Sequence, residues 1–156
     1  MKHQIYNHFL NSKLPGFEPG EYDFILLSKF KFEIGDASYF EFIIDSTNGG
    51  FFFDKAIQIY GYSSQFDFND ITYINTLLRN EYGSIFNGLT AFGQELFGNQ
   101  FCFDETTNNI IFFQAETGER EIIAKNFLEW IALYLMTWSI TQMLMYSNSG
   151  SVIEGR

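Results

Sequence analysis

Short apolar runs separated by polar turns dominate the chain between Gly50 and Ala124. Runs of this length that are rich in aromatic and β-branched residues are typical of strands. An alternation of Lys and Phe also predicts a half-buried strand over Phe24–Phe32. The expected strands in the first group are Phe51–Phe53, Ala56–Tyr60, Leu89–Phe92, Gln100–Phe103, Ile110–Gln114 and Glu121–Ala124, with the last two joined as a hairpin at Thr117–Gly118.

Two shorter segments have the apolar spacing of amphipathic helices. Asp36 can cap the first, over Ala37–Ser46, because its carboxylate can accept the free N–H groups of the first turn. Asn48-Gly49-Gly50 ends it, since glycine tolerates the left-handed conformation. Asn69 or Asp70 caps the second, which ends at Gly83; its expected apolar face is Ile71, Ile74, Leu77 and Leu78.

A longer helix is predicted over Phe127–Tyr146, which is almost entirely apolar. Its length would permit a membrane span. Glu129 lies inside it, however, and hydroxyl and amide side chains interrupt the second half. A helix packed on the sheet accounts for this pattern without placing Glu129 in lipid. We therefore expect no membrane association.

The first 23 residues carry both prolines and predict an irregular or partly helical arm. Both histidines of the chain, His3 and His8, fall in this arm, which we expect to be mobile. Their spacing does not match a metal-binding pair on one helical face. With no other histidine, Ser-His-Asp and Cys-His catalytic arrangements are disfavoured, so no metal or catalytic site is expected.

The chain is acidic, with a net charge of −10 and a pI of about 4.5. Between Lys55 and Arg120 there are eight carboxylates and one basic residue, Arg79, so that segment has a net charge of −7. Such a surface repels phosphates and attracts basic proteins, although the charge can also serve solubility alone. The candidate partner-binding residues are Glu95, Asp104, Glu105, Glu116 and Glu119.

Other chemistry receives little support from the residue patterns. Glu95, Asp104 and Glu116 could form a carboxylate cluster for acid–base catalysis, but their spacing does not require one. Asp104–Asn109 resembles a calcium loop only faintly, because it lacks the central glycine and the final glutamate. No phosphate-binding glycine motif occurs, so we expect no cofactor.

The length of 156 residues indicates a single domain, taken here as residues 1–150. The C-terminal Ile153-Glu154-Gly155-Arg156 matches the recognition sequence of factor Xa protease, so residues 151–156 are expected to be a linker and tag remnant. The single cysteine, Cys102, lies between two phenylalanines and is expected to pack as a small apolar residue. The absence of an N-terminal apolar run predicts a cytoplasmic protein.

Three motifs in order resemble the SUKH superfamily. The first is the aromatic helix Tyr39–Ile44 followed by Asn48-Gly49-Gly50; the second is Phe92–Asp104, in which Gly98-Asn99 precedes an apolar strand; the third is Ile123–Trp130 at the start of the last helix. The resemblance covers roughly residues 36–140. Many members begin the first helix with Leu-Pro, where this chain has Gly35-Asp36-Ala37, and residues 1–35 have no clear counterpart.

The resemblance implies an α+β fold with a central, mostly antiparallel, twisted sheet flanked by helices. It also implies a non-catalytic protein that, in bacteria, often binds and neutralises a toxin domain such as a nuclease or deaminase. An acidic protein suits a basic toxin, because it can imitate the phosphates of nucleic acid. Two alternatives stay open: a regulatory or scaffold module of the same fold, and a small-molecule-binding domain with a pocket beneath the acidic loops. A homodimer is possible under each of these three interpretations.

Overall fold

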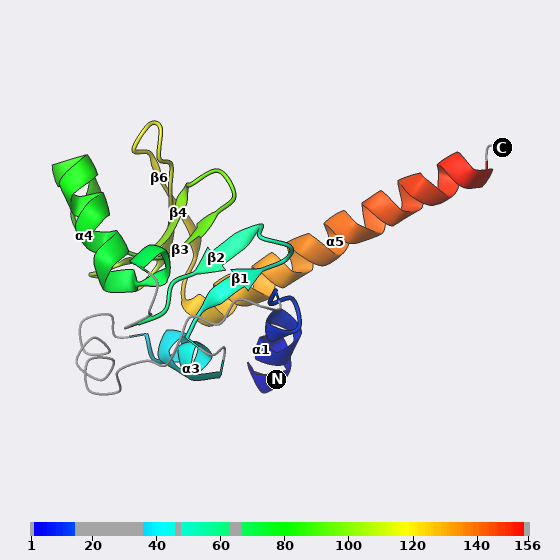
Figure 1. The fold of residues 1–156 in the computed structure, drawn as a ribbon, viewed down its shortest axis with the longest axis horizontal. Helices are drawn as coiled ribbons and strands as arrows, with labels where there is room; N and C mark the ends of the chain where they lie inside the picture. Colours follow the sequence, from blue (N-terminus) through cyan, green and yellow to red (C-terminus); the bar gives the residue numbers. More distant parts are fainter. Residues whose placement is uncertain (1, 15–35, 46–47, 63–66, 155–156) are drawn as a thin grey trace.

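The computed structural model describes residues 2–14, 36–45, 48–62 and 67–154. The strand predicted over Phe24–Phe32 and the prolines lie outside these ranges. Six strands form one sheet in which neighbours follow the order of the sequence and every pair is antiparallel (Figure 1). They are β1 (Gly50–Phe52), β2 (Ile57–Ile59), β3 (Leu89–Glu95), β4 (Gln100–Asp104), β5 (Ile110–Phe113) and β6 (Arg120–Ala124). The predicted α+β fold with an antiparallel sheet is confirmed.

Helices cover both faces of the sheet (Figure 1). One face is covered by α1 (Lys2–Leu10), α3 (Ala37–Asp45) and α5 (Phe127–Glu154), which contact one another. The other is covered by α4 (Ile71–Tyr82) and two short 3-10 helices, η1 (Asp67–Asn69) and η2 (Gly83–Phe86). Because both faces are covered, the strands are apolar along most of their length, as the sequence shows.

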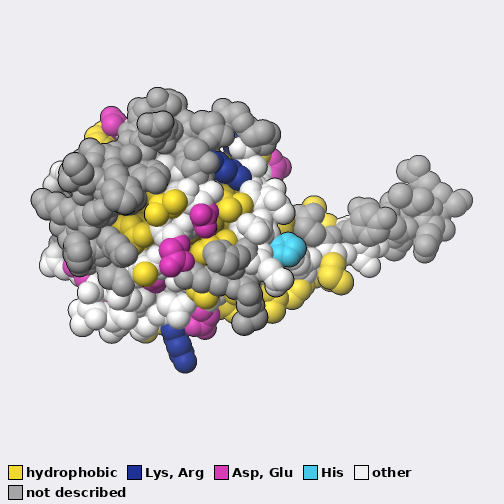
Figure 2. All heavy atoms as spheres, turned by 90° about the horizontal axis from the view of Figure 1, so that it is seen from below, with side chains coloured by type: hydrophobic (Ala, Val, Ile, Leu, Met, Phe, Trp, Pro, Cys, Tyr) yellow, Lys and Arg dark blue, Asp and Glu magenta, His cyan; other side chains and the backbone are white. Residues whose placement is uncertain are grey.

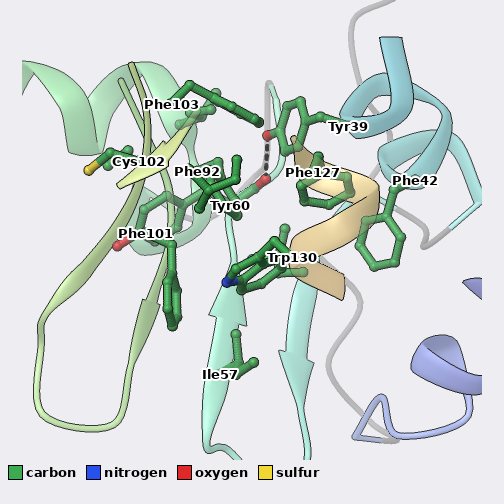
Figure 3. Packing of buried hydrophobic residues seen from close by; sticks show 14 of the residues in the cluster. Tyr39, Phe42, Ile57, Tyr60, Phe92, Phe101, Cys102, Phe103, Phe127 and Trp130 are labelled. Carbon is green, nitrogen blue, oxygen red and sulfur yellow. Dashed lines mark hydrogen bonds between the residues drawn. The ribbon is translucent and has the colours of Figure 1, made fainter. Parts of the chain in front are cut away.

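Alternation along the strands divides the core between the two faces. In β4, Phe101 and Phe103 contact aromatic rings of α5 and α3. Cys102, between them, points away from this cluster (Figure 3) and is fully buried. In β5, Phe113 packs on Tyr82 at the end of α4, with ring centroids 5.0 Å apart. The expectation that Cys102 packs as a small apolar residue is therefore confirmed.

The larger core is a cluster of aromatic rings between the sheet and α5 (Figure 3). Phe127 lies edge-to-face with Tyr39 at 5.5 Å and with Phe92 at 5.4 Å. Trp130 lies edge-to-face with Phe92 at 5.0 Å. Pairs in such geometries contribute roughly 0.5–1.5 kcal/mol each beyond their buried area. This cluster joins α3, α5 and two central strands into one unit.

Helix α1 adds to this cluster instead of forming a mobile arm. Tyr6 and Phe9 are both buried, and the Phe9 ring lies 4.9 Å from that of Phe52 and 5.4 Å from that of Phe42. The predicted mobility around the histidines is therefore wrong for the described part of this segment, residues 2–14. Two aromatic side chains one helical turn apart are enough to fix a short helix on the core.

One carboxylate caps two helices. Asp36 Oδ1 accepts a hydrogen bond from the backbone N–H of Ser38 (2.9 Å), as predicted for the start of α3. Its Oδ2 accepts a bond from the backbone N–H of Phe127 (3.1 Å), at the start of α5. Both helix N-termini therefore meet at a single negative charge, which their dipoles favour. Asp36 thus has a capping role at the start of both helices.

The second predicted helix is confirmed as α4, with one correction to its apolar face. Asp70, rather than Asn69, is the N-cap, and Gly83 ends the helix with φ 58°. Leu77 is 46% exposed and does not belong to the buried face. Asn75 is buried in its place, because its amide bonds both the N–H (2.7 Å) and the carbonyl (2.8 Å) of Ala91 in β3.

A chain of buried polar side chains crosses the α4 face of the sheet. Gln58 donates to the Phe68 carbonyl (2.7 Å), Gln94 to Gln58 (2.8 Å) and Gln100 to Gln94 (3.3 Å). The Tyr60 hydroxyl then donates to Gln100 Oε1 (2.7 Å). Gln58, Gln100 and Tyr60 are each at most 5% exposed. A broken link would leave a buried group unpaired, at a cost of about 1–3 kcal/mol.

Asn48 fixes the turn that leads from α3 into the sheet. Its side-chain amide donates to the Tyr62 carbonyl and accepts from the Tyr62 N–H, both at 2.6 Å. Its own carbonyl accepts from the side chain of Asn69 (3.2 Å), which connects this turn to η1. Asn48 and Gly49 both have positive φ, at 66° and 85°. Asn-Gly-Gly is therefore a structural motif here, as the sequence indicated.

Helix α5 continues well beyond the predicted end at Tyr146 and reaches Glu154. In the part of the chain that the structure describes, no helix combines the length and apolar content that a membrane crossing requires.

Gly49→Ala should destabilise the fold strongly. A Cβ at this position would lie 2.5 Å from the Ile59 carbonyl oxygen, and the backbone has positive φ. Gly83→Ala is a matched control, because it has φ 58° but open space around the added atom. In urea unfolding we expect a loss of about 1–3 kcal/mol for Gly83→Ala, whose ψ of −130° lies outside the left-handed helical region, and a clearly larger loss for Gly49→Ala, where backbone atoms also clash with the added Cβ. Equal losses would contradict the packing described.

Cys102 should resist thiol reagents until the protein unfolds. Burial raises the pKa of the Cys102 thiol, and the positive charge of Arg120 opposes this only in part. Because the folded state keeps the proton, stability should be full at neutral pH and fall as the pH rises above about 9. Urea unfolding at a series of pH values measures this, and Cys102→Ala should flatten the decline. Rapid alkylation of the native protein would contradict it.

Candidate functional site

Three hairpin turns lie at one end of the sheet, because the six strands alternate in direction. They are the β1–β2 turn (53–56), the β3–β4 turn (96–99) and the β5–β6 turn (114–119). Asn99 joins two of them, since its Oδ1 accepts a bond from the backbone N–H of Ala115 (2.9 Å). We call the group formed by Glu95, Leu96, Phe97, Glu116 and Glu119 the turn-end surface.

The β3–β4 turn is held rigidly by Glu95. Its Oε1 accepts bonds from the backbone N–H groups of Phe97 (2.9 Å) and Asn99 (3.0 Å). Gly98 closes the turn with φ 86° and donates to the Glu95 carbonyl (3.0 Å). Leu96 and Phe97 at its tip are 67% and 83% exposed. The turn thus presents an aromatic ring to solvent on a fixed backbone.

The β5–β6 turn presents two carboxylates beside it. Glu116 and Glu119 are exposed, and no described basic side chain lies within ion-pair distance of either. The turn is braced from the α4 side, because the Tyr82 hydroxyl donates to the Ala115 carbonyl (3.0 Å). Arg120, the nearest cation in sequence, instead donates to the backbone carbonyls of η2 and the following residue. The turn-end surface is therefore acidic, aromatic and well ordered.

The other two candidate acids lie at the opposite end of β4. Asp104 caps its own turn, with Oδ1 accepting from the N–H groups of Thr106 (2.8 Å) and Thr107 (3.1 Å). Glu105 pairs with Arg79 (3.3 Å), and both side chains are about half exposed. Such a surface pair contributes about 0–1 kcal/mol. These two carboxylates have local structural partners.

The structure therefore separates the five predicted acids into two groups. Glu95 and Asp104 are divided by the length of β4, roughly 13 Å at 3.3 Å per residue. Asp104 therefore lies apart from Glu95, and the carboxylate cluster with Glu116 that the spacing did not require has no support in this geometry. Within the described ranges, no three His, Cys, Asp or Glu residues are arranged to hold a metal ion.

Sequence reasoning missed two parts of this site. In the sequence, Leu96 and Phe97 belong to the motif that resembles the SUKH superfamily, and only the turn geometry shows that both side chains are exposed. Glu95 was chosen for its charge, although its carboxylate mainly organises the turn. The pKa of Tyr134 in α5 is raised, first by burial and then by the negative charge of Glu95, so this carboxylate also acts on α5. Gly98-Asn99 was the available signal for a turn at this place.

A groove of about 580 Å³ lies between α1 and α5 instead of beneath the acidic turns. Its walls are largely apolar, with Phe53, Leu135 and Trp138 among them. His8, on α1, also lines it. The sequence allowed a small-molecule pocket beneath the acidic loops, but this groove forms elsewhere, between α1 and α5.

Comparison with known proteins places the chain in a family without naming a close relative. No curated protein and no solved structure gives a significant match. The model of the SMI1 / KNR4 family (SUKH-1) matches residues 36–133, which span α3, the whole sheet and the packed start of α5. The chain therefore belongs to the SMI1 / KNR4 (SUKH-1) family.

Proposed function

We propose that this protein is an immunity protein that binds a bacterial toxin domain one-to-one and blocks it without turnover. Membership of the SUKH superfamily supports this, in view of the toxin-neutralising role that the resemblance implies for many bacterial members. The observation that carries the proposal is the turn-end surface, where the β3–β4 turn with the exposed Phe97 is bonded through Asn99 to the β5–β6 turn, which carries the exposed carboxylates Glu116 and Glu119. The proposed place of action is the cytoplasm of the cell that makes the toxin.

Rigid presentation suits tight binding. Interfaces are dominated by a few anchoring side chains, and aromatic residues are prominent among them. The Phe97 backbone N–H is already bonded to the Glu95 carboxylate, so little conformational entropy is lost when a partner binds. A ring that is 83% exposed in the isolated protein also gains much by burial in a partner's pocket.

The carboxylates give direction to the encounter. Glu116 and Glu119 lie in a chain segment of net charge −7, so they attract a basic surface at long range. Nucleic-acid-cleaving toxins must bind phosphates and therefore carry basic clefts. Two carboxylates on one turn can occupy such a cleft as phosphates do. The proposal thus favours a nuclease or another nucleic-acid-modifying toxin as the partner.

Removal of the turn-end charges and ring should abolish protection. We expect Phe97→Ala to weaken binding of the toxin encoded beside this gene by about 10- to 100-fold, as for a moderate hot spot. Glu116→Gln/Glu119→Gln should slow association several-fold and reduce its dependence on salt. Binding is measured by surface plasmon resonance at two ionic strengths, and function by growth rescue of cells that express the toxin.

A matched charge control comes from outside the turn-end surface. Asp45→Asn/Glu105→Gln removes the same number of exposed carboxylates, from the end of α3 and the far end of β4. This variant should bind and rescue as the wild type does. If both double variants weakened binding and growth rescue equally, only net charge would matter, and the assignment of binding to the turn-end surface would be wrong. Failure of the wild type to bind or rescue would contradict the immunity proposal itself.

A further inference from the structure

The second half of α5 leaves the body of the domain. The helix has 28 residues, so it is about 42 Å long at 1.5 Å per residue. Up to Trp138 its inner face packs against the core, and no described residue after Trp138 takes part in that core. Figures 1 and 2 show the rest of the helix projecting from the domain, with hydrophobic side chains along the part nearest the body.

A row of large apolar side chains runs along the outer side of this helix. Leu133, Met136, Ile140 and Met143 are 38%, 56%, 51% and 72% exposed. They are spaced by three, four and three residues, which places them on one side of a helix as in the seam of a coiled coil. We call these four residues the α5 stripe. It begins over the packed half of α5 and continues onto the projecting half.

The helix around the stripe carries no charged residue, although Met136 also lines the groove between α1 and α5, together with His8. Between Glu129 and Glu154 the sequence has no Asp, Glu, Lys, Arg or His. A solvent-exposed helix normally carries charged residues opposite its apolar face. The projecting half thus has both a seam of apolar residues and uncharged flanks, a pattern typical of a helix that packs against another helix.

We infer that a second copy of this chain covers the stripe, with the two α5 helices antiparallel and crossing at Trp138. In this register Leu133 faces Met143 of the second copy, and Met136 faces Ile140 of the second copy. All four stripe residues then find an apolar partner, and the two-fold axis repeats each contact. Such a self-complementary patch is what a symmetric dimer requires.

Charge selects the antiparallel direction. Glu129 lies four residues before Leu133, and Ser147 lies four residues after Met143, so both continue the spacing of the stripe. A parallel pair in register would place the two Glu129 carboxylates opposite each other, where like charges repel. The antiparallel pair places Glu129 opposite Ser147, an exposed hydroxyl. The Glu129 carboxylate also has a partner in its own chain, because its Oε2 accepts a hydrogen bond from the backbone N–H of Lys125 (3.1 Å).

The lengths of the two halves agree with this arrangement. Twelve residues, Phe127 to Trp138, hold the helix on its own domain, and at least as many follow. In the antiparallel pair each projecting half lies along the outer side of the other copy's packed half. The sheet of each domain then sits on the opposite side of its own α5, while α1 lies beside the stripe at Met136. The inference is independent of toxin binding at the turn-end surface.

Sedimentation equilibrium tests the dimer directly. The full chain should sediment as a concentration-dependent dimer. Met136→Glu/Ile140→Glu should raise its dissociation constant by about 100-fold or more, because each buried, unpaired charge costs at least a factor of ten. Met145→Glu is the control: it introduces one glutamate at an exposed position of the projecting half but off the stripe, and should leave the dimer intact. All three sites are exposed, so circular dichroism should show unchanged folding.

Cysteine cross-linking tests the direction. Leu133→Cys and Met143→Cys proteins, mixed and mildly oxidised, should form the mixed disulfide much faster than either forms a disulfide with itself. Preferential self-linking of Leu133→Cys would indicate a parallel pair and overturn the antiparallel register. A monomer at the highest soluble concentration, or a dimer unaffected by Met136→Glu/Ile140→Glu, would overturn the inference as a whole.

Discussion

The packing of Phe127 and Trp130 against the central strands is the contact on which the rest of the structure depends. These two rings sit at the first turn of α5 and meet Phe92 of β3 edge-to-face. Through Tyr39 they also fix α3. This contact sets the direction of α5, which runs beneath the sheet and projects beyond the β1–β2 turn (Figure 1). A polar cap supports it, because Asp36 bonds the N-termini of both helices.

The two faces of the sheet are stabilised by different kinds of contact. The α5 face is mainly an aromatic core, in which the Tyr39 hydroxyl donates to the Tyr60 carbonyl (2.7 Å), whereas the α4 face is crossed by hydrogen-bonded side chains from Gln58 to Gln100. Directional bonds hold strand register, because a slip of one residue would break every link. The turns at the end of these strands therefore inherit a fixed geometry. In our account the turn-end surface is specific because it is built on this register.

Much of the fold could be predicted because local patterns determine it. Apolar runs between turn residues give the six strands, and Asp36 and Asp70 mark helix starts through their own backbone bonds. Docking of α1 could not be predicted, because the contacts of Phe9 with Phe52 and Trp130 come from distant parts of the chain. The same holds for Leu77, whose place on α4 is decided by where Asn75 meets β3.

The candidate site was only partly predictable from the sequence. Charge identified Glu116 and Glu119, but it could not separate them from Asp104 and Glu105, since the two pairs differ in which end of the sheet they occupy. Phe97 was hidden in an apolar run, and its exposure depends on the bonds that Glu95 makes within the turn.

The most direct test of the central claim is hydrogen–deuterium exchange of the protein alone and in the presence of the product of the neighbouring gene, the proposed source of its toxin partner. The account predicts added protection in the β3–β4 and β5–β6 turns, residues 95–99 and 114–120, with little change at residues 104–109. Protection centred on residues 104–109, or spread over neither turn, would show that the partner binds elsewhere and that the turn-end surface is not the site.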